Sequence, residues 1–147
     1  MLNLSTSVKF KRVSDAVAAA TADVESASLD TQGFGAAMFC VAMGAVNAGN
    51  VVAVKAQQSS DDGVADGWSD LEGTSISVAD DADDDLVLLD IVRPQKRYVR
   101  CVVEIGTVNA VVDAIIGMLY DPIREPVTHD ASVAASEQHF GSAEGTA

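Results

Sequence analysis

Residues that could perform acid–base chemistry are few, and they lie near the C-terminal end of the chain. Only two histidines occur, His129 and His139. The triplet Thr128-His129-Asp130 has residue types found in hydrolytic triads, but a triad is defined by its geometry in space and not by neighbouring sequence positions. General acid–base catalysis needs a rigidly held group, whereas the sequence around these histidines is rich in Ser, Ala and Gly. We therefore expect no enzymatic activity, and no catalytic or cofactor-binding residue is predicted.

A second candidate for chemistry is the acidic run at residues 80–85, which contains five aspartates. Calcium takes six to eight oxygen ligands, so this run could supply part of a calcium site. The D-x-[DN]-x-[DN]-G spacing of an EF-hand is absent, and Asp61-Asp62-Gly63 does not match it either. Like charges at this density repel one another and favour a solvated loop. We interpret the run as a loop and predict no metal site, with calcium binding as the alternative.

Basic residues are scarce and clustered. The chain has 9 Lys and Arg against 22 Asp and Glu, and its net charge is −13. A surface this negative repels phosphate, so we expect neither nucleic acid nor an anionic membrane as a partner. The clustered basic residues either pair with the chain's own aspartates or dock against an acidic surface of a neighbouring protein. The candidate protein-interaction residues are Lys9, Lys11, Arg12, Arg93, Lys96, Arg97 and Arg100.

The elements that position these residues are predicted to be β-strands. Residues 34–43 form a long apolar run between glycines, which is typical of a strand buried on both sides. Clean alternation of apolar residues indicates strands with one face inward, at residues 50–58, 97–105 and 110–120. In the last of these strands, one face is expected to contain Val112, Ala114, Ile116 and Met118.

Shorter strands are predicted at residues 68–71, 76–78 and 86–92. Trp68 is expected to cover one end of the core. Short strands separated by turn signals, with no long helical pattern between them, favour an all-β fold. The strand pattern predicts an antiparallel β-sandwich or barrel with an N-terminal arm and an extended C-terminal tail.

The chain divides into three parts, namely an arm at residues 1–22, a β-sandwich domain at 23–120 and a tail at 121–147. Within the arm, Ser14 could cap a short helix, but the same residues could also run extended. The tail has few large apolar residues, so it cannot order itself without a partner. Cys40 and Cys101 lie in apolar runs and are expected to be free thiols.

No membrane-spanning segment and no signal peptide are predicted. The N-terminus lacks an apolar core of the kind found in signal peptides. Residues 31–54 carry no charge, but the glycines and asparagines among them fit a turn between strands better than the 20 or so apolar residues of a spanning helix.

The middle of the chain resembles a family of tailed-bacteriophage capsid decoration proteins, also called cement proteins. The resemblance spans roughly residues 30–130. It is carried by the sequence from Val54 to Gly63 (VKAQQSSDDG), by Trp68-Ser69-Asp70-Leu71, and by the stretch from Leu88 to Arg100 (LLDIVRPQKRYVR). These motifs are structural and contain no catalytic signature. The resemblance implies a jelly-roll protein made in the host cytoplasm that assembles as a homotrimer on the virion and staples subunits of the major capsid protein together.

Two other functions are compatible with the sequence. Similar chains could be components of the virion tail or neck. A carbohydrate-binding β-sandwich would present exposed aromatic side chains to sugar rings, and the candidates for that role are Trp68, Tyr98 and Tyr120, which lie far apart in the sequence.

Overall fold

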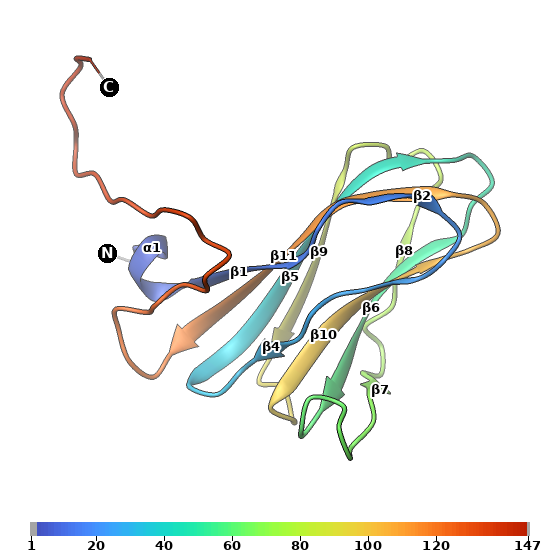
Figure 1. Ribbon diagram of the computed structural model, residues 1–147, viewed down its shortest axis with the longest axis horizontal. Coiled ribbons are helices and arrows are strands. Elements are labelled where there is room, and N and C mark those ends of the chain that lie inside the picture. Colours follow the sequence, from blue (N-terminus) through green and yellow to red (C-terminus); the bar gives the residue numbers. More distant parts are fainter. Residues whose placement is uncertain (1–2, 147) are drawn as a thin grey trace.

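The computed structural model describes residues 3–146 and contains two antiparallel β-sheets packed face to face (Figure 1). In sheet 1, β1 (Lys9–Ser14) and β2 (Val17–Ala20) pair with β11 (Ala110–Pro122), which is followed by β5 (Phe34–Val46) and then by β9 (Leu86–Val92) at the far edge. In sheet 2, β3 (Val24–Glu25) and β4 (Leu29–Asp30) pair with β10 (Tyr98–Ile105), and β10 pairs with β6 (Val52–Ser59). The other side of β6 pairs with β7 (Ser69–Asp70) and β8 (Ile76–Val78).

The connectivity is that of a jelly roll. The chain changes sheet at almost every long connection, from β4 to β5, from β5 to β6 and from β8 through β9 and β10 to β11. Each long strand therefore pairs with strands that are distant in sequence, as in the double Greek key of jelly-roll proteins. The predicted all-β sandwich is confirmed.

Alternating side chains from both sheets fill the space between them. Phe39 and Val41 from sheet 1 meet Leu29, Val99 and Val103 from sheet 2, and all five are almost completely inaccessible to solvent. The scarcity of aromatic residues in the sequence leaves this core to Val, Ala, Leu and Ile, which interdigitate well on pleated surfaces.

A β-bulge in β11 overturns the predicted face of that strand. Val112 pairs with Met43 while Ala114 pairs with Ala42, so one extra residue lies in β11 at this point. Because a shift of one residue exchanges the two faces of a strand, Val112 is buried in the core while Ile116 points outward and is 41% exposed. The prediction that Val112, Ala114, Ile116 and Met118 share a face is therefore wrong.

Both terminal segments lie along one edge of sheet 1. Residues 9–20 of the predicted arm form β1 and β2 of sheet 1, so they are part of the sandwich and not an arm outside it, and the α-helix α1 covers only Leu4–Ser7. The tail runs beside β1, where the amide of Asp130 donates to the carbonyl of Phe10 and the amide of Arg12 donates to the Ser132 hydroxyl. Toward the C-terminus the chain then extends away from the sandwich (Figure 1). In residues 3–146, no helix is long and apolar enough to cross a membrane.

Candidate protein-interaction surface

Three of the four basic residues at 93–100 make ion pairs within the chain. Lys96 Nζ lies 2.7 Å from Asp66 Oδ2, and Arg97 binds the Asp30 carboxylate through Nε and Nη2 at 2.7 and 2.6 Å. The hydrogen bond from Lys96, together with bonds from Ser60, lowers the pKa of Asp66 to about 2. The hydrogen bond from Arg97 lowers the pKa of Asp30. These cations are thus engaged by the chain's own acidic residues.

Arg100 is the most constrained member of this group. Its guanidinium binds Glu25 through two hydrogen bonds of 2.8 and 3.0 Å, and Nε donates to Gln57 Oε1 at 2.8 Å. The same guanidinium lies 4.6 Å from the centre of the Trp68 ring, within the range of a cation–π contact. Trp68 therefore lies against the outer face of sheet 2, and the expectation that it covers an end of the core is wrong.

The outer face of sheet 2 is a surface of paired charges. Lys55 lies 2.6 Å from Glu104 and 2.9 Å from Asp70, and Asp70 also accepts a hydrogen bond from Gln57. The hydrogen bond to Glu104, and then that to Asp70, raises the pKa of Lys55. Together with the Arg100–Glu25 pair, these contacts make this face a solvated network whose charges are satisfied internally.

The remaining predicted basic residues lie elsewhere. Arg12 forms an exposed pair with Asp15. Lys11 Nζ donates to the carbonyl of Ser28 at 3.0 Å and so joins the two sheets at their edge. Arg93 has a positive φ of 53° in the turn after β9.

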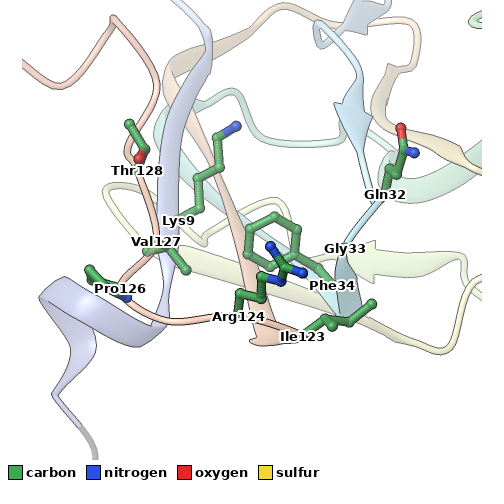
Figure 2. A pocket seen from close by; sticks show the side chains of 9 residues that line it. All are labelled: Lys9, Gln32, Gly33, Phe34, Ile123, Arg124, Pro126, Val127 and Thr128. Carbon is green, nitrogen blue, oxygen red and sulfur yellow. The ribbon is translucent and has the colours of Figure 1, made fainter.

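Lys9 lies at an open groove of about 530 Å³ beside the start of the tail (Figure 2). Figure 2 shows Lys9 and Arg124 around the ring of Phe34, with Ile123 and Val127 along the same rim. The structure therefore distributes the seven predicted residues over several regions and does not gather them into one basic patch.

The outer face of sheet 1 differs sharply from that of sheet 2. Register pairing places Ile116, Cys40 and Leu88 in one row across three strands, and Phe10, Met118 and Met38 in the next row. We call this surface the apolar face. It consists of Phe10, Met38, Cys40, Ala42, Leu86, Leu88, Val92, Ile116 and Met118.

Several side chains of the apolar face are strongly exposed. Leu86 is 64% exposed, Leu88 55% and Val92 63%. The only charges in the two central rows are Arg12 on β1 and Asp90 on β9, at opposite edges. At one end, a hollow of about 620 Å³ lies between α1 and this face. Contiguous apolar surface rimmed by charge is typical of a protein–protein contact.

Sequence reasoning missed this face. The signal was present in β9, where Leu86, Leu88 and Val92 alternate with the buried Leu89 and Ile91, so that both faces of the strand are apolar. For β11 the period-two pattern assigned Val112 and Ile116 to the same face, because the bulge between them cannot be seen from the sequence.

The two cysteines are free, as predicted, and their surroundings differ. Cys101 is completely buried in the core, and this burial raises the pKa of its thiol to about 12. Cys40 is half-buried in the middle of the apolar face. A thiol with a pKa this high is essentially never the reactive thiolate at neutral pH, so only Cys40 is placed to react with a reagent.

The acidic run at residues 80–85 acts as a cap for the neighbouring turn. Asp83 accepts a hydrogen bond from the amide of Val46, and Asp80 accepts one from the amide of Gly49, both at 2.6 Å. Within residues 3–146, no group of three or more His, Cys, Asp or Glu side chains is arranged to hold a metal ion.

His129 has a structural contact. Its Nδ1 accepts a hydrogen bond from the amide of Phe10 at 3.3 Å, and the two rings lie 5.7 Å apart. This contact holds the tail against β1.

The candidate sugar-binding aromatics lie on opposite surfaces. Tyr98 shares the outer face of sheet 2 with Trp68 and Arg100, whereas Tyr120 lies in sheet 1 and donates to Asp90 at 2.8 Å. Burial, reinforced by the hydrogen bond to Asp90, raises the pKa of Tyr120 to about 12. These three rings cannot form one stacking platform.

Comparison with known proteins identifies a fold relative. No protein-family model matches the chain, and no curated protein matches it. Among solved structures, the crystal structure of the phage PBSX exported protein XepA is similar, with a TM-score of 0.51 at 16% sequence identity. The similarity covers 96% of this chain and 46% of the XepA chain, so this chain spans about half the length of its structural relative. At this identity the likeness establishes that the two proteins share a β-sandwich fold.

Proposed function

We propose that this chain is a structural protein of a phage particle that decorates and stabilises the capsid, contacting major capsid protein subunits and other copies of itself. It acts without catalysis and without a cofactor. The sequence resemblance implies that copies of the chain associate as a trimer, and the proposal itself requires only that copies associate.

The observation that carries the proposal is the contrast between the two outer faces of the sandwich. Charges on sheet 2 are satisfied within the chain, as the Arg100–Glu25 and Lys55–Glu104 pairs illustrate. Sheet 1 instead presents Leu86, Leu88 and Val92 to solvent. Because exposed apolar area on this scale stabilises a protein only once it is covered, the face fits a protein whose work is to pack against protein.

The tail supports the same proposal. In residues 134–146, Phe140 is 75% exposed and no hydrogen bond joins this segment to the sandwich. A segment that orders only on a partner loses entropy when it binds, and many copies on a shell offset weak single contacts through multivalency. The fold likeness to a phage protein agrees with this setting.

Mass spectrometry and electron cryo-microscopy of purified particles test the proposal. We expect many copies of the chain on the outer surface of the shell. A few copies at the neck or tail would retain a virion role but refute decoration, and absence from particles would refute both.

A binding assay on stripped capsids adds a matched comparison. The full chain and a variant lacking residues 134–147 are added to capsids at equal concentrations, and bound chain is counted. We expect lower occupancy for the truncated chain. Equal occupancy would show that the tail does not contact the capsid.

A further inference from the structure

We propose that the apolar face is an interface between two copies of this chain, which pack sheet 1 against sheet 1 around a two-fold axis parallel to the strands. The inference deepens the proposed function and rests on its premise that the chain works by association. It commits to a second copy as the occupant of the face and to a dimer in place of the trimer that the sequence resemblance implies.

The first argument is that apolar side chains from four strands adjoin one another across the face. The row Ile116–Cys40–Leu88 runs from β11 to β9, and the row Phe10–Met118–Met38 runs from β1 to β5 and ends at Asp90 on β9. Two sheets with such faces pack about 10 Å apart with their strands nearly aligned. The same packing already forms the core of this chain on the other side of sheet 1.

The second argument is charge complementarity. Arg12 lies on β1 at one edge of the face, and Asp90 lies on β9 at the opposite edge, one row away. Rotation by 180° about an axis along the strands exchanges these two edges. Arg12 of one copy then lies within one row of Asp90 of the other, where it would exchange its exposed contact with Asp15 for Asp90, and the same pair forms twice, as an isologous interface requires. A two-fold axis across the strands would instead place like charges together.

The third argument is size. Seven paired positions along β5 and β9 and four strand widths give a face of roughly 450 Å² per copy, from strand rises of about 3.4 Å and spacings of about 4.8 Å. Two such faces bury roughly 900 Å², below the ~1,600 Å² of a standard stable complex. We therefore expect a weak dimer in solution, which neighbouring attachment points on a shell would strengthen.

Sedimentation equilibrium of the purified chain is the first test. We expect the average mass to rise from monomer toward dimer as concentration is raised to about 1 mM, the range of weak complexes. Leu88→Asp places two unpaired carboxylates in the interface and should raise the dissociation constant on the order of 100-fold. Val64→Asp adds the same charge at a loop position that is 86% exposed and off the face, so it should change nothing. A chain that stays monomeric, or that forms a trimer, would overturn the inference.

Charge exchange tests the two-fold axis itself. Arg12→Glu and Asp90→Arg each create two like-charged pairs, so each should weaken self-association at least about tenfold. An equimolar mixture of these two variants restores opposite charges in both pairs, and it should form heterodimers about as well as the original chain. A mixture no better than either variant alone would refute this geometry.

Cys40 reports coverage of the face without any mutation. Its alkylation should slow as concentration rises, while Cys101 stays unmodified at all concentrations because it is buried. A Cys40 rate that is independent of concentration, in samples where dimer is present, would place the interface elsewhere. None of these measurements involves capsids. Failure of the chain to bind capsids would refute the proposed decoration of the capsid but not the dimer. A chain that stays monomeric would refute the dimer but not capsid binding.

Discussion

Two arginines on sheet 2 offer a controlled test of whether the basic residues stabilise the fold or serve as docking groups. Arg97 and Arg100 each bind one carboxylate through two hydrogen bonds, and each guanidinium also lies over an aromatic ring, at 5.0 and 4.6 Å. Their burial differs, because the side chain of Arg97 is 45% exposed and that of Arg100 is 14% exposed. Truncation of each to alanine therefore compares the same chemistry at two levels of burial.

The expected magnitudes follow from this difference. Arg97→Ala removes an exposed ion pair and an exposed cation–π contact, both weakened by solvent, so we expect only a small loss of stability. Arg100→Ala also removes the hydrogen bond to Gln57 and uncovers part of Trp68, for a loss of about 2–3 kcal/mol. Glu25 stays half-exposed, so no buried charge is stranded.

Thermal and urea unfolding, followed by circular dichroism, measure both variants. At about 2–4 °C per kcal/mol for a chain of this size, Arg100→Ala should lower the melting temperature by roughly 5–10 °C and Arg97→Ala by less than about 4 °C. Equal and small effects would refute the stabilising role assigned to Arg100. In that case a loss of capsid occupancy by Arg100→Ala would favour the docking role that the sequence suggests for this cluster.

Three further predictions concern acid stability, the tail and the core. Because Lys96 lowers the pKa of Asp66 to about 2 from an ordinary 3.8, the folded chain binds fewer protons than the unfolded chain between these values. The free energy of unfolding of the original chain should therefore fall as the pH drops through this window, and that of Asp66→Asn should fall less steeply. If the original chain and the variant lost stability equally with falling pH, the prediction would be contradicted. Deletion of residues 134–147 should leave the melting temperature unchanged. Deletion of residues 127–147 exposes the edge of β1 and should lower the free energy of unfolding by about 1–3 kcal/mol. Equal melting curves for the two truncated chains would contradict the tail's contact with β1. Phe39→Ala should cost about 3–5 kcal/mol in urea unfolding, because Phe39 is fully buried at the centre of the core, and a loss below about 1 kcal/mol would contradict that placement.

The strands could be predicted from the sequence because each one is specified by the pattern of apolar and turn residues within its own segment. The alternation in residues 97–105 corresponds to β10, where Val99, Cys101 and Val103 are buried between the sheets. The predicted strand at residues 86–92 has the bounds of β9. Turn residues separate these elements, and no helical period competes with the period of two, so the all-β class follows from local pattern alone.

Other features depend on contacts between distant residues and could not be predicted. The assignment of residues 9–20 to sheet 1 depends on pairing with β11, about a hundred positions later. The partners of Arg97 and Arg100 come from β4 and β3, which lie close to them only because both strands pair with β10. A basic cluster in the sequence has the same appearance whether its partners lie in the same chain or in another, so the choice between pairing and docking needed the structure.

The proposed packing on the apolar face explains why the run at residues 34–43 is apolar on both sides. The run at residues 34–43 has the composition of a strand that is buried on both sides, yet in the single chain only one side of β5 is covered. Phe39 and Val41 are fully buried, while Met38 and Cys40, on the opposite side, remain partly open to solvent. A strand that needed to be apolar only toward its own core would carry polar residues at these alternate positions, as the exposed side of an antiparallel sheet normally does. A second copy packed on the apolar face would bury that other side of β5. The apolar residues on both sides of this strand are therefore what we expect of a strand that is covered on both sides in a dimer.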